Sequence, residues 1–473
     1  MSAEFVSVIL AAGQGTRMKS DRPKVLHAVA GLPMYAHVVR AALRAGASEV
    51  VLVIGHGRDE VARDVQARFD SHVTTAVQEQ QIGTGDAVRV GVSAASIAEF
   101  DGYVVVLYGD TPLVHVGLLE ALMARASESG ADAVALTSEV ADATGYGRIL
   151  RDAAGNVTAI REHKDASPAE RAVREINCGL YAFKAPFLRA AIAKLATNNA
   201  QGELYITDVI EQAAQQRSVS TLSWAFADVG GVNDRSQLAA CETALRLRIA
   251  NELARAGVTV RDPATTYVEV DVRVEADAVL EANVHLRGKT SIAAGARVDT
   301  GCVLQNVQVA AGAYLKPYTV ATDSEIGENV ETGPFAHLRP QSVLEAESKV
   351  GNFVETKKTR LGRGSKASHL SYLGDGQIGR DVNIGAGTIF CNYDGVNKNT
   401  TTLEDGVFIG SDSQLIAPVR IGERAYVATG TTVNRDVPAG AMAISRNKQE
   451  NKEGYADRLW ARFKALKAAK NKP

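Results

Sequence analysis

Glycines and basic residues gather in one short segment near the start of the chain, "LAAGQGTRMKSDRPKVL" at residues 10–26. Gly13 and Gly15 let the backbone approach a ligand closely and turn its N–H groups toward an anion. Arg17 and Lys24 add positive charge at the same place. A lone G-x-G is weak evidence, and the segment is neither a dinucleotide fingerprint nor a P-loop. With the two cations beside it, the segment favours a phosphate-binding loop over a plain turn.

A second candidate for ligand chemistry is "YGDTP" at residues 108–112, directly after an apolar run. Asp110 at the end of a buried strand would lie at the ligand-binding edge of an open sheet. Taken alone, its carboxylate could equally be the N-cap of the next helix. A phosphate loop in the same domain favours a carboxylate that holds Mg²⁺.

Polar side chains also gather far downstream, between about residues 333 and 393. Arg339 and Lys357 are two cations that suit a phosphate. His369 is a candidate base, although a lone histidine is more often structural. Ser371 as a nucleophile paired with His369 is an open alternative, and no third orienting group is evident in the sequence.

The elements that must position the first group follow an alternating pattern. Apolar runs at residues 5–10, 50–54 and 103–108 are continuous, as in parallel strands buried on both faces, and residues 131–137 predict a further strand. Amphipathic segments lie between them. Residues 1 to about 230 therefore predict a doubly wound, Rossmann-like α/β domain. Residues 234–256 predict one long connecting helix.

After Pro263 the period of the sequence changes to six. The in-step residues are Val268, Val274, Leu280, Leu286, Ile292, Val298, Leu304, then Ile378, Ile384, Phe390, then Leu403, Ile409, Leu415, Ile421, Val427 and Val433. Such a repeat indicates a solenoid, in which three hexapeptides close one coil of a parallel β-helix. Each buried aliphatic contributes about 1.5–3 kcal/mol, so a stack of coils stabilises itself. The repeat breaks at "FCNYDGVNKNTTT" (390–402), which predicts a loop that leaves the coil and returns.

Composition bounds the remaining choices. A length of 473 residues predicts two or three domains. A net charge of −2 gives no electrostatic argument for nucleic acid or membrane, and no apolar run reaches about 18 residues, so neither partner is expected. Four cysteines without a C-x-x-C pair predict reduced thiols in a cytoplasmic protein. The start of the chain lacks the features of a signal peptide. The tail from Asn447 predicts a docked helix or, as the alternative, a solvated basic end.

These motifs together resemble the nucleotide-sugar pyrophosphorylases. The resemblance continues through "QQIGTGDA" (80–87), "TGYGRI" (144–149), "EHKDA" (162–166), "NCG" (177–179), "NNAQGELYITD" (198–208) and "GVNDR" (231–235). In the second half, "GNFVETKK", "SHLSYLGD", "NIGAGTIFCNYDG", "GSDSQLIAP" and "AISR" resemble an acetyltransferase. Nearly the whole chain is thus similar to the bacterial family of bifunctional N-acetylglucosamine-1-phosphate uridylyltransferases and glucosamine-1-phosphate acetyltransferases.

The resemblance implies a reaction sequence, an assembly and a domain plan. Glucosamine 1-phosphate would be acetylated by acetyl-CoA, and UMP would then pass from UTP to the product, giving UDP-N-acetylglucosamine for cell-wall and lipopolysaccharide synthesis, with Mg²⁺ as cofactor. The protein would be a homotrimer of left-handed β-helices. The expected parts are a uridylyltransferase domain (1–230), a linker helix (231–262), a β-helix acetyltransferase domain (263–446) and a C-terminal helical tail (447–473).

The resemblance also implies roles for single residues. Arg17 and Lys24 would be catalytic in uridylyl transfer, His369 would be the general base of acetyl transfer, and Asp110 with Asn233 would bind Mg²⁺. Substrates of uridylyl transfer would contact Leu10, Ala11, Ala12, Gly13, Lys24, Gln78, Gly83, Thr84, Tyr108, Gly109, Asp110, Gly147, Glu162, Asn177 and Asn233. Substrates of acetyl transfer would contact Arg339, Lys357, Tyr372, Asn383, Ala386, Asn392, Tyr393, Ser411, Thr429 and Arg446. Gln14, Cys178 and Thr429 depart from the residues usual in the family, and Thr429 leaves CoA affinity open if its contact is through the side chain.

Two other functions compete with the bifunctional enzyme. One is a nucleotidyltransferase whose β-helix is only structural or regulatory, and His369, Lys357 and the polar break argue against it. The other is a non-catalytic scaffold that binds nucleotide sugars. Arg17, Lys24 and Asp110 together argue against that one.

Overall fold

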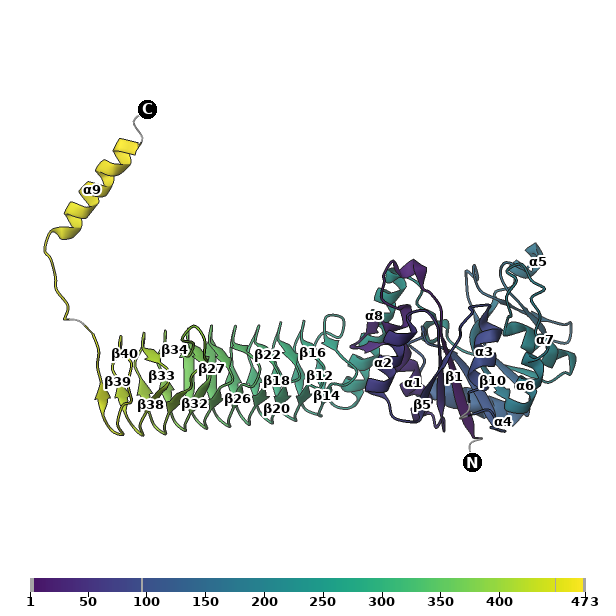
Figure 1. Cartoon of the computed structure of the whole chain (residues 1–473), viewed down its shortest axis with the longest axis horizontal. Helices are drawn as coiled ribbons and strands as arrows, with labels where there is room; N and C mark the ends of the chain where they lie inside the picture. The colour runs from purple at the N-terminus through teal and green to yellow at the C-terminus, as the bar shows by residue number, and fades with distance from the viewer. Residues whose placement is uncertain (1–3, 95–96, 447, 471–473) are drawn as a thin grey trace. The chain divides into compact units, whose positions relative to one another are not determined.

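The computed structural model describes residues 4–94, 97–446 and 448–470. The chain forms two compact units, and Figure 1 shows the elements of each. Unit 1 comprises residues 1–255 and 266–272, and unit 2 comprises residues 256–265 and 273–473. The first three residues of the predicted uridylyltransferase domain, and Asn447 and residues 471–473 of the predicted tail, lie outside the described residues.

Unit 1 is built on one mixed sheet. Its strands run in the order β11 (Val219–Ser223), β7 (Ala133–Glu139), β10 (Glu175–Lys184), β6 (Tyr103–Tyr108), β1 (Phe5–Ala11), β4 (Val50–Ile54) and β5 (Val73–Val77). Strand β10 is antiparallel to both of its neighbours, and the other pairs along this path are parallel. The α/β class predicted from the alternating pattern is confirmed, with one antiparallel strand that the pattern does not predict.

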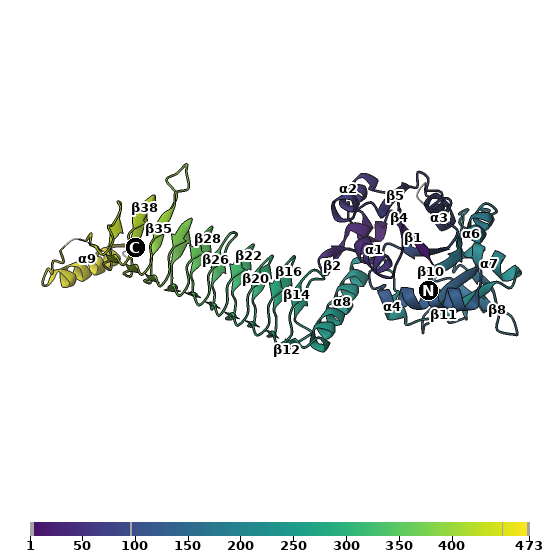
Figure 2. The ribbon, with the colours of Figure 1, turned by 90° about the horizontal axis from the view of Figure 1, so that it is seen from below.

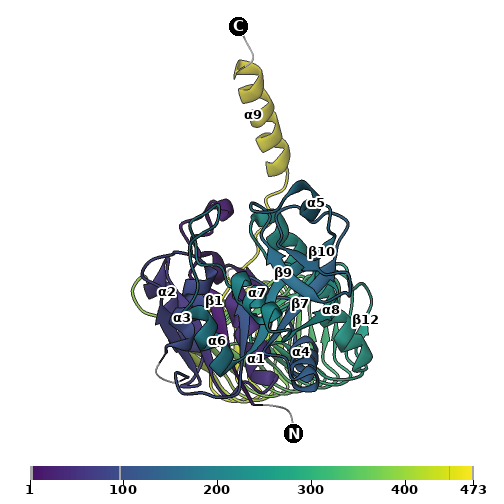
Figure 3. The same cartoon turned by 90° about the vertical axis from the view of Figure 1, so that its right-hand side faces the viewer.

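Helices cover both faces of this sheet because its strands are apolar on both faces. Along β1, Phe5 and Ile9 belong to one buried cluster, while Val6 and Val8 belong to the other. The first cluster is completed by α1 (Met34–Arg44), α2 (Arg58–Arg68) and α4 (Val116–Ser129). The second is completed by α3 (Thr84–Val92), α6 (Ala185–Ile192) and α7 (Thr207–Gln215). Figure 3 shows α1 and α4, which contact each other, side by side at the bottom of the view.

The long helix predicted as a connector is α8 (Arg235–Arg255). Its Cys241 and Leu245 join a small buried cluster with Met34 and Leu113. Arg248 adds a hydrogen bond from Nη1 to the Leu113 carbonyl oxygen at 2.8 Å. Helix α8 is therefore part of the packing of unit 1.

Unit 2 is a parallel β-helix with three stacked sheets of short strands. Sheet I runs from β12 (Thr259–Val260) to β41 (Met442–Ala443), sheet II runs through β16 (His285–Arg287) to β40 (Thr432–Val433), and sheet III runs from β14 (Arg273–Val274) to β38 (Val419–Ile421). The in-step residues of the six-residue repeat point inward and are buried, except Val274, which is half-buried. The predicted β-helix is confirmed.

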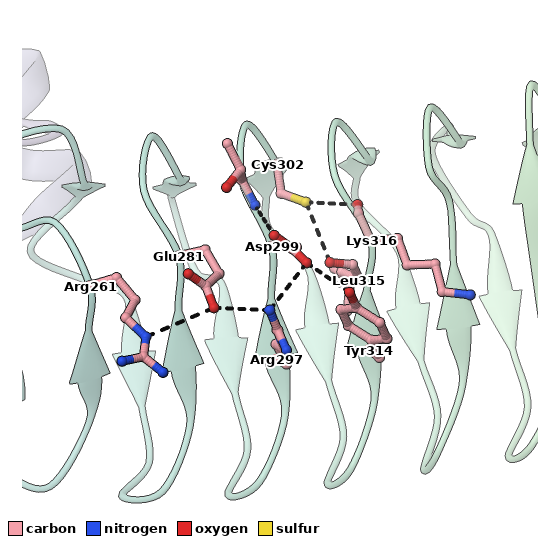
Figure 4. Close-up of polar contacts among 9 residues, drawn as sticks. Arg261, Glu281, Arg297, Asp299, Cys302, Tyr314, Leu315 and Lys316 are labelled. Atoms are coloured by element: carbon pink, nitrogen blue, oxygen red, sulfur yellow. Dashed lines mark hydrogen bonds and ion pairs between the residues drawn. The ribbon is translucent and has the colours of Figure 1, made fainter.

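Charged side chains bridge successive coils on the outside of unit 2 (Figure 4). Arg297 pairs with Glu281 at 3.0 Å and with Asp299 at 3.6 Å, and the Tyr314 hydroxyl donates to Asp299 at 2.7 Å. Arg297 is half-exposed, so each of its ion pairs contributes under about 1 kcal/mol. Next to this row, burial raises the pKa of the Cys302 thiol to about 12. The inward stripe, and not this row, supplies most of the stability.

The C-terminal segment forms α9 (Tyr455–Lys470), which buries none of its residues. The helix predicted for the tail is present, but docking on the rest of the chain is not seen. Among the described residues, no helix has both the length and the apolar character needed to cross a membrane.

Candidate active sites

A cavity of about 410 Å³ opens in unit 1 at the carboxyl ends of β1 and β6. Ligands of open α/β sheets bind at this edge. Of the residues predicted for uridylyl transfer, those that line the cavity are Leu10, Ala11, Ala12, Gly13, Arg17, Lys24, Gln78, Gly83, Thr84, Tyr108, Asp110 and Asn233. The structure therefore brings most of that predicted set together in one place.

The glycine-rich loop owes its shape to Gly15. This residue has a φ of +64°, and a Cβ atom there would lie 2.5 Å from the Lys24 Cβ. Only glycine allows the loop to run this close to Lys24. The loop leads into the short helix η1 (Thr16–Met18), and from there Arg17 Nη2 donates to Asn233 Oδ1 at 2.9 Å.

Oxygen ligands converge on one cationic atom at the centre of the cavity. Lys24 Nζ lies 2.5 Å from Asp110 Oδ2 and 2.9 Å from Asn233 Oδ1. A carboxylate and an amide oxygen are hard donors of the kind that Mg²⁺ prefers, and Mg²⁺ usually completes its shell with substrate phosphates and water. No group of three or more His, Cys, Asp or Glu side chains with metal-binding geometry occurs among the described residues. The donor set at Asp110 and Asn233 therefore fits an ion shared with a substrate.

Gln78 and Gly83 lie together at another end of the cavity. Gln78 follows β5 and is 5% exposed, and its Nε2 donates to Asp86 Oδ2 at 2.8 Å and to the Gly83 carbonyl oxygen at 3.2 Å. Gly83 has a φ of +119°, and a Cβ atom there would lie 2.4 Å from the Leu204 carbonyl oxygen. The hydroxyl of Thr84 accepts from the Ile206 N–H at 3.1 Å. This end of the cavity is therefore rigid.

The three residues predicted to hold the sugar adjoin one another. The Asn177 N–H donates to the Gly147 carbonyl oxygen at 2.9 Å, and a Cβ atom at Gly147 would lie 3.5 Å from Glu162 Oε1. Burial raises the pKa of the Glu162 carboxyl. Burial, with the charges of Glu162 and Asp110, also raises the pKa of Tyr108. The trio does not line the cavity itself, and neither does Gly109, whose N–H donates to the Leu10 carbonyl oxygen at 2.9 Å.

Some residues that line the cavity have no predicted binding role. They are Thr16, Val25, Gln81, Ala87 and Glu203. Gln81 donates from Nε2 to the Ala12 carbonyl oxygen at 2.6 Å and so holds the glycine-rich loop. Gln81 and Glu203 belong to motifs that carry the family resemblance, and membership of those motifs is the signal that could have found them.

In unit 2, His369 closes strand β30 (Lys366–His369) and meets Asn352 of β27 (Lys349–Asn352). The His369 Nδ1 lies 2.8 Å from Asn352 Oδ1, and because a carbonyl oxygen only accepts, Nδ1 carries the proton. The Nε2 lone pair is then available to accept a proton. Asn352 is the orienting group that the sequence did not reveal. It stands 17 residues earlier, which is one coil, so the repeat itself was the signal.

Ser371 does not pair with the His369 ring. Its hydroxyl donates to the backbone carbonyl oxygen of His369 at 2.9 Å and lies 3.3 Å from that of Gly385. The residue is 4% exposed. The alternative of a serine nucleophile is therefore wrong, because the hydroxyl points into the wall of the β-helix.

Two cations predicted for the sugar phosphate lie on neighbouring coils of sheet II. Leu338 of β25 (His337–Leu338) pairs with Thr356 of β28 (Glu355–Lys357), which places Arg339 beside Lys357. Arg339 Nη1 donates to Glu355 Oε1 at 2.7 Å. Lys357 Nζ lies 3.7 Å from Asp375 Oδ2, which also accepts from Asn392 Nδ2. The predicted Tyr372 opens the next strand of this sheet, β31 (Tyr372–Gly374).

Residues predicted for acetyl-CoA stack along one corner of successive coils. The Asp412 N–H donates to the Ala386 carbonyl oxygen at 2.7 Å, and the Gly430 N–H donates to that of Ser411 at 2.8 Å. Arg446 Nη1 donates to the Thr429 carbonyl oxygen at 2.8 Å. Asn383 opens β33 (Asn383–Ile384) on an adjacent face and is exposed.

The break in the repeat is a loop between β34 (Ile389–Cys391) and β35 (Thr401–Leu403), and Figure 2 shows it projecting beside β35. Its base is closed by the Asn399 N–H, which donates to the Asn392 carbonyl oxygen at 2.7 Å. At its tip, hydrogen bonds from the backbone of Asn397 and Val396 lower the pKa of Asp394 to about 2. Tyr393 is 55% exposed. The loop is therefore ordered by its own contacts and presents an aromatic ring.

The mixed α/β sheet, with a cavity lined by a glycine-rich loop and two cations, is typical of a nucleotidyltransferase. The parallel β-helix, with a histidine held by a hydrogen bond from its ring, is typical of hexapeptide-repeat acyltransferases. Residues 7–202 match the MobA-like NTP transferase domain family. The bifunctional protein GlmU of Sorangium cellulosum is 56% identical over 470 residues, covering 97% of this chain and 98% of that protein. GlmU proteins of Pelobacter propionicus and Brevibacillus brevis are 48% and 46% identical, each over 96% of this chain and 98% and 97% of those proteins. The chain belongs to the bifunctional GlmU family.

Membership decides between the functions that the sequence left in competition. The chain is a bifunctional enzyme of UDP-N-acetylglucosamine biosynthesis, with uridylyltransferase and acetyltransferase activities. Relatives that share nearly its full length exclude a nucleotidyltransferase whose β-helix is only structural or regulatory, and they also exclude a non-catalytic scaffold.

Proposed function

We propose that the cavity of unit 1 binds UTP with its phosphates at Gly13, Arg17 and Lys24 and its uracil at Gln78, Gly83 and Thr84. N-acetylglucosamine 1-phosphate would lie against Gly147, Glu162 and Asn177. Its phosphate oxygen attacks the α-phosphorus of UTP in line, and pyrophosphate leaves. The chain contributes positioning and charge neutralisation, which are the main sources of catalysis in phosphoryl transfer. The observation that carries this proposal is the convergence of Lys24, Asp110 and Asn233 on one point of the cavity.

Asp110 and Asn233 would hold Mg²⁺, which neutralises charge on the phosphates when bound. Lys24 Nζ lies against the same two oxygens, and two cations do not share them. We infer that Lys24 then turns from Asp110 toward a phosphate. Arg17, which is hydrogen-bonded to Asn233, remains on the phosphate side of the site.

In unit 2, we propose that His369 is the general base that takes a proton from the amine of glucosamine 1-phosphate. The hydrogen bond to Asn352 fixes the ring with Nε2 unprotonated, as a base requires. Arg339 and Lys357, which pair with Glu355 and Asp375 respectively, would bind the sugar phosphate. Tyr372 and Asn383 would contact the sugar.

Acetyl-CoA would lie along the corner formed by Ala386, Ser411 and Thr429, with Arg446 at its far end and the 392–400 loop over it. We expect Tyr393→Ala to raise the KM for acetyl-CoA roughly 5- to 30-fold, because an exposed ring contributes about 1–2 kcal/mol of contact. Thermal unfolding should stay unchanged, since the Asn392–Asn399 hydrogen bond at the base of the loop is kept. Steady-state kinetics with a thiol reagent measures the effect. An unchanged KM would contradict a role of the loop in binding.

We propose a homotrimer in which a corner of the β-helix meets a second copy of the chain. At this corner Tyr318, Phe335, Phe353 and Leu370 are each about half-exposed on successive coils. The rings of Phe335 and Phe353 stack at 5.6 Å with an interplanar angle of 10°. All four residues have φ between 46° and 60°, a conformation that costs bulky side chains roughly 1–2 kcal/mol each. Covering the row with an identical chain would offset that cost.

Phe335→Glu combined with Phe353→Glu tests this seam. We expect the mass measured by light scattering to fall from that of a trimer to that of a monomer, because two buried charges oppose association. We also expect acetyl transfer to fall at least about 10-fold. Uridylyl transfer in the same preparation should be retained, which controls for folding of unit 1. A trimer mass that does not change would contradict the seam.

A further inference from the structure

A buried carboxylate lies behind the end of the cavity proposed for the base, and none of the roles above uses it. Asp86 stands in the first turn of α3 and is 4% exposed. Burying a charged carboxylate is unfavourable unless it is hydrogen-bonded or paired. Asp86 has two such partners, and each binds a different oxygen of its carboxylate.

One partner is the amide of Gln78. Its Nε2 donates to Asp86 Oδ2 at 2.8 Å and to the Gly83 carbonyl oxygen at 3.2 Å. A carboxylate and a carbonyl oxygen only accept hydrogen bonds, so the end of the amide that faces them is the NH₂ group. Asp86 thus permits only one of the two orientations of the Gln78 amide.

The other partner is Arg89, three residues further along α3. Its Nη2 donates to Asp86 Oδ1, so each carboxylate oxygen serves a different neighbour. The guanidinium holds Oδ1, which leaves Oδ2 to Gln78. The Asp86–Arg89 ion pair thus sets the orientation of the neutral Gln78 amide, which lines the cavity.

The direction of that amide decides which pyrimidine fits. Uracil presents a donor at N3 and an acceptor at position 4, whereas cytosine presents an acceptor at N3 and an amino donor at position 4. Donor and acceptor are exchanged at both atoms. With its NH₂ group turned to Asp86 and Gly83, the amide presents Oε1, which accepts from N3–H of uracil and is opposed by the acceptor N3 of cytosine.

We propose that Asp86, held by Arg89, is the positioning residue that selects uridine over cytidine nucleotides by fixing the Gln78 amide. The inference rests on the proposed placement of the base at Gln78 and adds the cause of its selectivity. Asp86 need not touch the nucleotide. Its effect passes through the Gln78 side chain, which lines the cavity.

Asp86→Asn in the full-length enzyme tests this inference. Arg89 would keep the one remaining oxygen, so the new NH₂ group would face Gln78 and favour the reversed amide. We expect the ratio of kcat/KM for UTP to kcat/KM for CTP, measured by pyrophosphate release, to fall roughly 10- to 100-fold. Because both values scale with the active fraction, the ratio does not depend on how much of the variant folds.

The matched control is Asp271→Asn, which removes the carboxylate charge of another Arg–Asp pair in unit 1, formed with Arg40 at 2.6 Å. It should leave the ratio unchanged. The double change Asp86→Asn with Arg89→Ala should recover part of the ratio, because the asparagine is then free to turn. Equal losses for UTP and CTP in Asp86→Asn would reduce Asp86 to a structural role and overturn the inference. Gln78→Leu distinguishes a failure of this inference from a failure of the proposed base site. If Gln78→Leu leaves the ratio unchanged, the placement of the base at Gln78 is overturned.

Discussion

Replacing His369 with alanine is expected to lower acetyl transfer by about 100- to 10,000-fold while uridylyl transfer continues at its normal rate. The size follows from the loss of a positioned general base. The selectivity follows because His369 and its partner Asn352 lie in unit 2, whereas the residues around the other cavity lie in unit 1. Release of free CoA thiol and of pyrophosphate from one preparation measures both activities. Loss of both would contradict two independent sites.

Asn352 supplies a sharper form of this test. Asn352→Ala removes the acceptor for Nδ1–H and should lower kcat about 10-fold with little change in the KM for acetyl-CoA. Asn352→Asp keeps an acceptor but adds a negative charge, which stabilises the protonated imidazole. The acid limb of the pH–rate profile should therefore move to higher pH. A profile that stays in place would mean that Asn352 only supports the coil.

Asp110→Asn is expected to have the opposite selectivity, with uridylyl transfer reduced roughly 100- to 1,000-fold and acetyl transfer retained. The change keeps the shape of the side chain but removes the charge that would hold Mg²⁺ beside Asn233. It also removes the negative charge that pairs with Lys24 Nζ at 2.5 Å. Added Mg²⁺ should restore part of the activity, because a weaker site saturates at a higher concentration.

Lys24→Met provides the comparison for Asp110→Asn. It should lower uridylyl transfer without raising the Mg²⁺ concentration needed for half-maximal rate, since it leaves both oxygen ligands in place. Titrations of rate against Mg²⁺ separate the two variants. Equal Mg²⁺ dependence in the wild type and Asp110→Asn would contradict the assignment of the metal to Asp110.

Experiments on separate halves of the chain should keep α8 with unit 1, because α8 packs there. A cut after residue 230 would remove Cys241 and Leu245 from their cluster with Met34 and Leu113, and would break the hydrogen bond from the Val232 N–H to the Asp110 carbonyl oxygen. We propose a cut between Arg255 and Ala256, where the two compact units change over. Residues 266–272, which group with unit 1, remain with the second fragment in this design.

The sequence by itself determined the features that are local or periodic. The stripe from Leu280 to Leu304 is buried as the six-residue period predicts, because each coil repeats the same inward position. The glycine-rich loop could also be predicted, since a positive φ at Gly15 and the charges of Arg17 and Lys24 are properties of one short segment. The family motifs named most of the residues that line the cavity of unit 1.

Only the tertiary structure decided which distant groups meet. Lys24 reaches Asp110 across 86 residues and Asn233 across 209, and no pattern within either segment specifies those distances. The antiparallel direction of β10 likewise depends on how the chain returns to the sheet, since both directions bury the same apolar residues. Asn352 meets His369 because of the length of one coil, and Asp86 meets Gln78 because the turn at Gly83 folds α3 back onto β5. Apolar periodicity states what is buried, whereas a hydrogen bond between two side chains needs positions that only the assembled backbone fixes.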